Sequence, residues 1–210
     1  MYDDVRMAAK TDPDCIYIDG MEGSTGAGPH LAAEETGVPG IAAIRQARKA
    51  LDDVDQSGNI SLIYAGGIRT GGDVAKALAF GADAVAIGHS SLMALNCNKD
   101  IPEADYLAEV GVEAGHCYHC HTGRCPVGVA TQDPVLRKRL DPDAAAERVY
   151  NFLHTLTLEC QMLARACGKT NVHSLEPEDL AALTMEASAL AMVPLAGTQF
   201  TVGRPDMTRY

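Results

Sequence analysis

Three cysteines stand within nine residues, in the segment Cys117-Tyr118-His119-Cys120-His121-Thr122-Gly123-Arg124-Cys125-Pro126. Polar and turn-forming residues separate them, so their thiolates can converge on one soft metal centre. A final cysteine followed by proline is typical of ferredoxin-type cluster loops. The spacing therefore predicts an iron–sulfur cluster bound by Cys117, Cys120 and Cys125.

Three alternatives remain at this stage. The segment from Cys117 to His121 also fits the C-x-x-C-H pattern of c-type haem attachment, which requires export. The chain opens with early acids and lacks the apolar stretch of a signal peptide, which argues against haem. Zinc accepts the same spacing if His116, His119 or His121 supplies a fourth ligand. The last alternative is three unrelated buried thiols.

Composition narrows the class of protein. The chain has 210 residues, of which 47% are hydrophobic and 21% are charged, as in soluble globular proteins. No run approaches the roughly 18 to 20 apolar residues that span a bilayer, so we expect no membrane partner. A net charge of -11 without a basic stripe argues against nucleic acid. Seven cysteines make a disulfide framework improbable, so we expect a reducing, cytoplasmic location.

Four further cysteines, Cys15, Cys97, Cys160 and Cys167, occur in apolar or helical stretches. The simplest interpretation is that they are small core residues. Cys97 is also a candidate fourth ligand of the cluster.

The first 90 residues repeat a strand, a glycine-rich turn and a helix. Strands are predicted over residues 15–18, 60–65 and 84–87, and helices over 40–51 and 74–80. Continuous apolar runs joined by helical crossovers are typical of a parallel sheet. The pattern therefore predicts an α/β fold.

The second half of the chain is predicted to be helical. Asp141-Pro142 starts a long helix that Gly168 closes after Cys167, and a further helix opens near Ser174 with Pro177 in its first turn. From Val193 onward we expect an extended tail.

Two glycine loops could hold a phosphate. Gly66-Gly67 follows the second strand, and Gly88-His89-Ser90 follows the third, before a short helix with Leu92 and Leu95. Backbone N–H groups of such loops bind phosphate oxygens, with Arg69 and Ser90 adding a charge and a hydroxyl. The loops after the last two strands of (β/α)8 barrels often form such a site.

Four motifs in this order resemble the FMN-binding synthase domain of glutamate synthase. They are residues 19–27 (DGMEGSTGA), 65–74 (AGGIRTGGDV), 81–88 (GADAVAIG) and 120–133 (CHTGRCPVGVATQD). The resemblance covers about residues 1–140. It implies the C-terminal portion of a (β/α)8 TIM barrel, with about three parallel strands, followed by an iron–sulfur loop and a helical C-terminal segment. The implied domains are residues 1–100, 101–133 and 134–210.

The resemblance also implies cofactors and site residues. FMN would be held by Gly23, Ser24, Thr25 and Gly26 beside the flavin ring, and by Gly66, Gly67, Arg69, Gly88, His89 and Ser90 near the phosphate. The cysteines would hold a 3Fe–4S or 4Fe–4S cluster. Ser24 replaces the family's usual glycine, and Cys117 stands closer to Cys120 than the usual C-x5-C-x4-C spacing allows.

The implied activity is reduction of 2-iminoglutarate, made from 2-oxoglutarate and ammonia, to glutamate. The small-molecule ligands would be 2-oxoglutarate and glutamate, and separate amidotransferase and electron-donor subunits are expected. N-methylglutamate synthase is an alternative within the enzyme class. A non-catalytic truncated remnant and a zinc-stabilised interaction module are alternatives of another class.

Overall fold

The computed structural model describes residues 1–24, 28–97, 107–108, 111, 117 and 119–203. The chain divides into two compact units, which are taken one at a time below. The first comprises Met1–Gly23, Gly37–Ala86 and Leu156–Tyr210, and the second comprises Ser24–Thr36 and Ile87–Thr155. The domain limits expected from the sequence stay a prediction.

A parallel sheet forms the centre of the first unit. Its strands are β1 (Cys15–Asp19), β2 (Ser61–Ala65) and β3 (Ala84–Ala86), in the order β1-β2-β3. Ile18 pairs with Tyr64, and Tyr64 with Val85. The α/β class and the three parallel strands are therefore confirmed for the described part of the chain.

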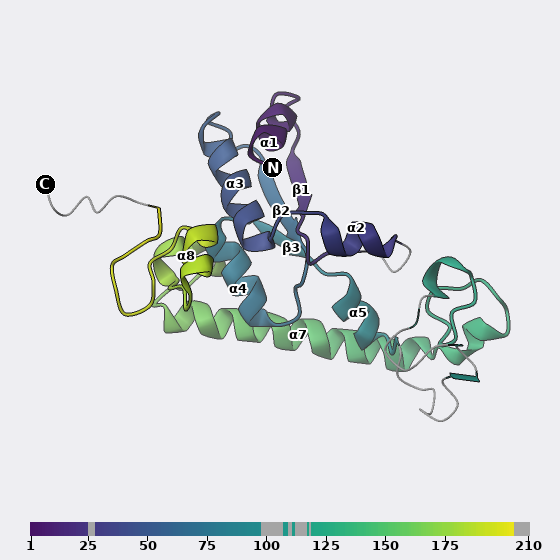
Figure 1. The fold of residues 1–210 in the computed structure, drawn as a ribbon. Coiled ribbons are helices and arrows are strands. Elements are labelled where there is room, and N and C mark those ends of the chain that lie inside the picture. Colours follow the sequence, from purple (N-terminus) through teal and green to yellow (C-terminus); the bar gives the residue numbers. More distant parts are fainter. Residues whose placement is uncertain (25–27, 98–106, 109–110, 112–116, 118, 204–210) are drawn as a thin grey trace, which may run out of the picture. The chain divides into compact units, whose positions relative to one another are not determined.

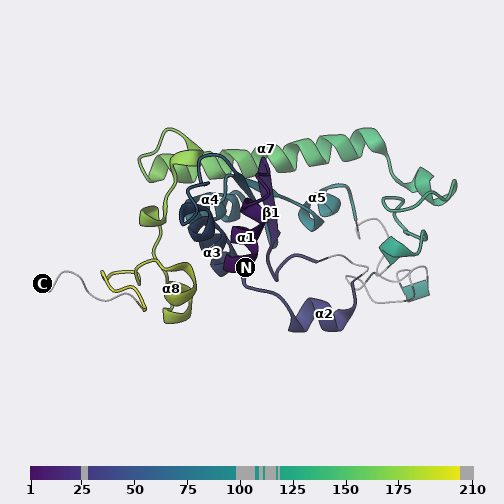
Figure 2. The ribbon, with the colours of Figure 1, turned by 90° about the horizontal axis from the view of Figure 1, so that it is seen from above.

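The strand order determines where the connecting helices lie. Parallel crossovers share one handedness, so a sheet whose strands follow in sequence keeps its helices on one face. Helices α3 (Gly40–Asp52) and α4 (Gly71–Phe80) indeed lie on the same side of the sheet in both views (Figures 1 and 2). Such single winding is the rule in (β/α)8 barrels, whereas doubly wound sheets reverse direction at a switch point.

The two faces of the sheet differ in burial. Side chains alternate between the faces of a strand, so Ile18, Leu62 and Tyr64 share the face that is buried. The opposite face carries Tyr17, which is 56% exposed, and its register partner Ile63, which is half-buried. This second face is less well covered than the first at these positions.

Helix α3 supplies much of the core. Its residues Ala43, Ile44, Ala47 and Leu51 recur at helical spacing and are all buried. Helix α1 (Tyr2–Ala9), which the sequence did not predict, contacts α3 and buries Val5 and Ala9. The predicted helices over 40–51 and 74–80 are confirmed.

Helix α7 (Pro142–Ala166) contributes residues to both units, those from Leu156 onward to the first. In the first unit it approaches the start of α4 closely, because a Cβ on Gly71 would lie 2.3 Å from the Leu156 carbonyl oxygen. Gly168, with φ +74°, follows the helix as a left-handed residue. The long helix predicted to end near Cys167 is confirmed.

The prediction of a helix that opens near Ser174 is wrong. The structure has two single turns of 3₁₀-helix, η3 (Val172–Ser174) and η4 (Pro177–Asp179). The α-helix α8 (Met185–Ala191) starts only after Thr184, whose hydroxyl accepts a hydrogen bond from the Ala187 amide. Between them Ala182 forms a β-bridge with Leu195, which extends the backbone and leaves Leu183 86% exposed.

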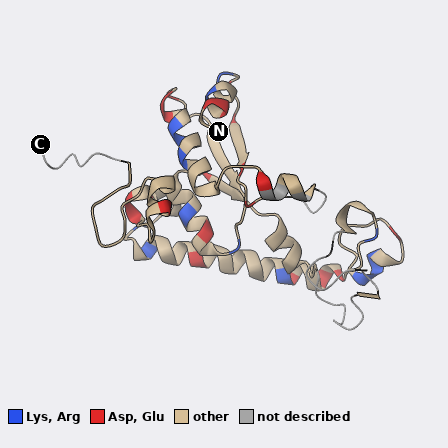
Figure 3. Cartoon of the chain, viewed as in Figure 1, with Lys and Arg blue, Asp and Glu red and all other residues tan. Residues whose placement is uncertain are grey.

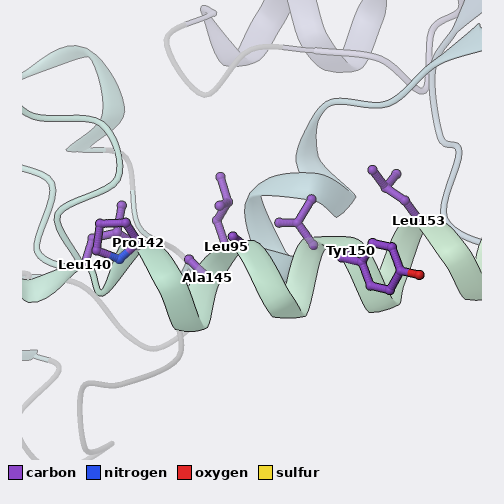
Figure 4. A pocket seen from close by; sticks show the side chains of 8 residues that line it. Leu95, Leu140, Pro142, Ala145, Tyr150 and Leu153 are labelled. Atoms are coloured by element: carbon purple, nitrogen blue, oxygen red, sulfur yellow. The ribbon is translucent and has the colours of Figure 1, made fainter.

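The second unit holds short elements and the first part of α7. Its described residues include the helices α2 (His30–Glu35) and α5 (His89–Ala94) and the 3₁₀ turns η1 (His119–His121) and η2 (Leu136–Arg139). An apolar pocket lies along α7, where Leu95, Leu140 and Tyr150 are among the lining residues (Figure 4). No described helix combines the length and the apolar composition that crossing a bilayer requires.

Candidate functional site

In the first unit, the loops that follow β1 and β2 pack directly against each other. The Gly20 amide donates to the Ala65 carbonyl at 2.9 Å. A Cβ on Gly66 would lie 3.2 Å from the backbone nitrogens of both Gly20 and Gly23. The carboxyl ends of parallel strands lie at one edge of a sheet, where open α/β sheets bind ligands. The structure thus brings together the predicted site residues Gly23 and Gly66.

Glu22 ties these loops to α3. Its carboxylate oxygens accept hydrogen bonds from the Gly40 amide at 3.1 and 3.0 Å. Gly40 is the first residue of α3, so the negative charge lies at the positive end of that helix. The bond spans 18 residues of sequence and joins the loop after β1 to the start of α3.

Tyr64 completes this network from β2. Its hydroxyl donates to the Gly66 carbonyl at 2.9 Å and lies 3.4 Å from Glu22 Oε2. Burial, followed by the negative charge of Glu22, raises the pKa of Tyr64 well above its ordinary value. A Cβ on Gly40 would lie 1.8 Å from the same hydroxyl, so glycine is needed there. Neither Glu22 nor Tyr64 was predicted as a site residue.

The second loop continues through Gly67 to Arg69. Gly66 and Gly67 have φ of +120° and +68°, conformations that glycine adopts without strain. Arg69 is exposed, and its backbone amide donates to Asp73 Oδ2 at 3.1 Å. The loop therefore turns sharply before α4 and presents a basic side chain at the surface.

Backbone amides at the start of α4 have hydrogen-bond acceptors within the chain. Thr70 and Asp73 form a reciprocal capping box, and the Gly71 amide donates to Glu159 Oε2 at 2.7 Å. Two carboxylates thus occupy the helix N-terminus, where an anion would otherwise bind. A phosphate near this loop would depend on Gly66, Gly67 and Arg69 instead of the first turn of α4.

The remaining predicted flavin residues belong to the second unit. Ser24, Gly88 and His89 are exposed, and Ser90 is half-buried. Gly88 precedes α5, and its carbonyl accepts from Ser91 and Leu92. Thr25 and Gly26 lie outside the described residues.

From His119 onward, the cysteine segment of the second unit is a series of turns. The Thr122 hydroxyl donates to the His119 carbonyl at 2.9 Å and accepts from the Arg124 amide at 3.2 Å. Farther along, the Thr131 hydroxyl donates to the Gly123 carbonyl. These bonds close a compact loop around Cys125, which is buried, whereas Cys120 is exposed.

Four thiols of this unit are coupled electrostatically. Burial raises the pKa of Cys97, and the negative charges of Cys120, Cys125 and Cys117 raise it further. The pKa of Cys120 is raised by partial desolvation of its sulfur and then by the negative charges of Cys117 and Cys125. Like charges disfavour the thiolates, and a bound cation would reverse this effect.

The donor set suits iron–sulfur chemistry, since all four side chains are thiols. Among the described residues, however, no group of three or more His, Cys, Asp or Glu side chains is arranged to hold a metal ion. Iron–sulfur ligation by Cys117, Cys120 and Cys125 therefore stays a prediction, as does a role for Cys97.

Comparison with known proteins gives a consistent result. A family model described as a conserved region in glutamate synthase matches residues 1–170. A glutamate synthase large subunit-like protein of Rhizobium meliloti (strain 1021) is 50% identical over 203 residues, which are 97% of this chain and 46% of the relative. An archaeal glutamate synthase (NADPH) of Methanocaldococcus jannaschii is 39% identical over 167 residues, which are 80% of this chain and 29% of the relative.

The chain therefore spans less than half the length of these relatives. Among solved structures, an L230A mutant flavocytochrome b2 with benzoylformate matches 86% of this chain and 38% of its own. The TM-score is 0.43 and the identity is 19%, a likeness too loose to carry an argument.

Proposed function

Since this chain belongs to the glutamate synthase family, we propose that it forms part of an FMN- and iron–sulfur-dependent oxidoreductase that reduces 2-iminoglutarate to glutamate. The iminoglutarate would come from 2-oxoglutarate and ammonia. The observation that carries the proposal is the packing of two glycine loops at the carboxyl edge of a singly wound parallel sheet. Bound FMN would supply reducing equivalents to the substrate, and the cluster would supply electrons singly.

The residue types in these loops are suited to binding a flavin phosphate. Gly66 and Gly67 allow a phosphate to approach the backbone closely, and exposed Arg69 can neutralise its charge. The hydrogen bonds of Glu22 and Tyr64 hold the two loops in place, which lowers the entropy cost of ordering them around a ligand. By the resemblance to the family, Gly23, Ser24, Thr25 and Gly26 would line the flavin ring, and Gly88, His89 and Ser90 would bind near the phosphate.

We base the proposed iron–sulfur centre on the cysteines of the second unit. Cys117, Cys120 and Cys125 would hold a 3Fe–4S centre, and Cys97 as a fourth ligand would permit a 4Fe–4S centre. The electrostatic interaction of Cys97 with the other three thiols supports its inclusion.

The less well covered face of the sheet supports a barrel context. Tyr17 and Ile63 lie on the face opposite to α3 and α4, and in a (β/α)8 barrel this face would be directed to the packed interior. Further strands, from more of the same polypeptide or from a partner, would complete it. A separate amidotransferase could deliver ammonia, and a separate donor could deliver electrons.

Anaerobic reconstitution of the chain with FMN, iron and sulfide tests the proposal. We expect flavin and cluster absorbance, followed by glutamate formation from 2-oxoglutarate and ammonia once the other barrel strands and a two-electron supply from a chemical reductant such as dithionite are added. A matched assay with methylamine and glutamate as substrates distinguishes N-methylglutamate synthesis from glutamate synthesis. A colourless protein that contains stoichiometric zinc would overturn the proposal in favour of a zinc-stabilised module.

A further inference from the structure

Carboxylates already occupy several backbone donors of the loop between β2 and α4. The amides of Arg69, Thr70 and Gly71 donate to carboxylate oxygens at 3.1, 3.0 and 2.7 Å. The Gly67 amide is different, since within the described part of the chain it donates to no acceptor, and Gly67 is exposed. A ligand oxygen at this loop would therefore find the Gly67 amide available as a donor.

Tyr64 controls the direction of this amide through the carbonyl that precedes it. The Tyr64 hydroxyl donates to the Gly66 carbonyl at 2.9 Å. That carbonyl and the Gly67 N–H belong to one peptide group, which is planar and trans, so the two bonds point in opposite directions. Tyr64 is buried beside the start of α3, where a Cβ on Gly40 would overlap its hydroxyl. Packing thus holds the donor in place, and its bond directs the Gly67 N–H away from Tyr64.

Glycine at both positions makes this control necessary. Gly66 and Gly67 have φ of +120° and +68°. Without a Cβ, a glycine pair also tolerates the peptide group between them rotated by about half a turn. In the rotated form the Gly66 oxygen would replace the Gly67 N–H at the ligand and would repel a phosphate. The apparent Kd for an anion rises as the fraction of correctly oriented loop falls.

The distribution of charge in the first unit increases the importance of this donor. Residues 19–23 and 66–73, which form the two loops, contain one basic side chain, that of Arg69. Figure 3 shows the other basic side chains of the described first unit chiefly on its helices, α3 among them. A phosphate at these loops would have a single side-chain cation from them, so correctly directed amides must supply further hydrogen bonds.

We propose that Tyr64 is a positioning residue, whose hydroxyl holds the Gly66–Gly67 peptide so that the Gly67 amide faces a phosphate oxygen, and that it thereby makes the site prefer FMN to riboflavin. This inference rests on the proposed function, because it takes FMN as the ligand. Riboflavin has the same ring and ribityl chain but no phosphate, so it gains nothing from the directed amide.

Fluorescence titration of the full chain measures both affinities, because the two flavins share the fluorescent ring. Tyr64→Phe removes only the hydroxyl. We expect its Kd for FMN to rise about fivefold, and its Kd for riboflavin to stay within about twofold of the wild type. Tyr2→Phe is the matched control. It also removes a bonded hydroxyl, which donates to Asp53 at the C-terminal end of α3, and it should leave both Kd values unchanged.

A double-mutant cycle tests whether Tyr64 acts through Gly67. Gly67→Ala strains the loop at φ +68° and should weaken FMN binding by itself. Adding Tyr64→Phe to Gly67→Ala should then change the Kd for FMN by less than about twofold, because the amide is no longer correctly placed. A further loss as large as that of Tyr64→Phe alone would show that the two residues act independently, and the inference would be wrong.

The riboflavin titration separates positioning from a merely structural role. Equal losses of affinity for FMN and riboflavin in Tyr64→Phe would show that Tyr64 only supports the fold of the loops. An unchanged Kd for FMN would show that the peptide keeps its orientation without the hydroxyl. A wild type that binds both flavins equally would retain a flavin site but contradict the phosphate contact. A wild type that binds neither flavin would overturn the proposed function itself.

Discussion

The carboxylate of Glu159 in α7 accepts a hydrogen bond of 2.7 Å from the backbone amide of Gly71, the first residue of α4. The two residues are 88 positions apart in the sequence. This bond joins the long helix to the helix that follows the Gly66–Gly67 loop, and so links the C-terminal segment to the candidate phosphate loop.

Replacing Glu159 with alanine should destabilise the chain. The variant leaves the Gly71 amide without its acceptor, and the expected loss is about 1 to 2 kcal/mol in the free energy of unfolding. Urea denaturation followed by circular dichroism measures it. Glu159→Gln keeps an oxygen acceptor and should lose less than half as much, and an equal loss in both variants would show that the acceptor is not what matters.

The Tyr64 hydroxyl should make stability depend on alkaline pH. Its pKa is raised above the ordinary value of 10.0, so the folded state holds the proton more tightly than the unfolded state. The stabilisation is complete below about pH 10 and decreases as the pH rises from there towards the folded-state pKa.

Urea unfolding at several pH values compares the wild type with Tyr64→Phe. The wild type should lose more stability than the variant above about pH 10. Below that pH, Tyr64→Phe should be less stable by about 1 kcal/mol, since it lacks the bond to the Gly66 carbonyl. Tyr2, whose pKa is also raised through its bond to Asp53, titrates in both proteins and cancels in the comparison. Parallel pH profiles of the two proteins would contradict the prediction.

Gly67→Ala should weaken FMN binding. Alanine at φ +68° costs about 1 kcal/mol or more in backbone strain, which distorts the loop that would approach the phosphate. We expect at least a fivefold rise in the Kd for FMN by fluorescence titration. Gly58→Ala is the matched control, since a Cβ there meets nothing within 4 Å, and its Kd should stay within twofold of the wild type.

Cys97→Ser should change the cluster if Cys97 is its fourth ligand. We expect the reconstituted variant to hold a three-iron centre, visible by electron paramagnetic resonance in the oxidised state, where the wild type holds a four-iron centre. Cys167→Ser, at an exposed cysteine outside the cluster loop, should leave the iron content and the spectrum unchanged. Identical spectra for the wild type and Cys97→Ser would exclude Cys97 as a ligand.

Thiol alkylation of the metal-free chain tests the proximity of the cysteines directly. The charges of Cys117 and Cys125 help to raise the pKa of Cys120. Cys117→Ser removes one of these charges, so Cys120 should be alkylated faster near pH 8, because the thiolate is the reactive form. Mass spectrometry measures the rate of alkylation. Partial desolvation is the larger cause and remains in the variant, so the gain in rate should be modest. No change in rate would indicate that the sulfurs lie apart.

Local sequence signals predicted the sheet and its main helices. The strands were readable because each is a short apolar run ended by glycine, and α3 because Ile44, Ala47 and Leu51 share one face. The helix expected from Ser174 failed because Glu176 and Asp179 cap each other across a single turn, and Thr184 starts α8 separately. A start signal in the sequence does not specify how long the helix will be.

The site was predicted less completely. The glycines of both loops were found because their motifs are contiguous in the sequence. Glu22 and Tyr64 were missed because their contacts join residues 18 and 42 positions apart, which no local pattern encodes. A tyrosine within an otherwise apolar strand was the available signal, since a buried hydroxyl usually needs a partner.

The strand order β1-β2-β3 also bears on how the chain assembles during synthesis. Each strand leaves the ribosome after the neighbour with which it pairs, so the sheet can grow by addition at one edge. Among the three described strands, none has to insert between two others that have already paired. Domains generally fold as their segments emerge, and pairings that join near neighbours in sequence form fastest. Vectorial folding of this kind would complete the two glycine loops before the cysteine segment emerges.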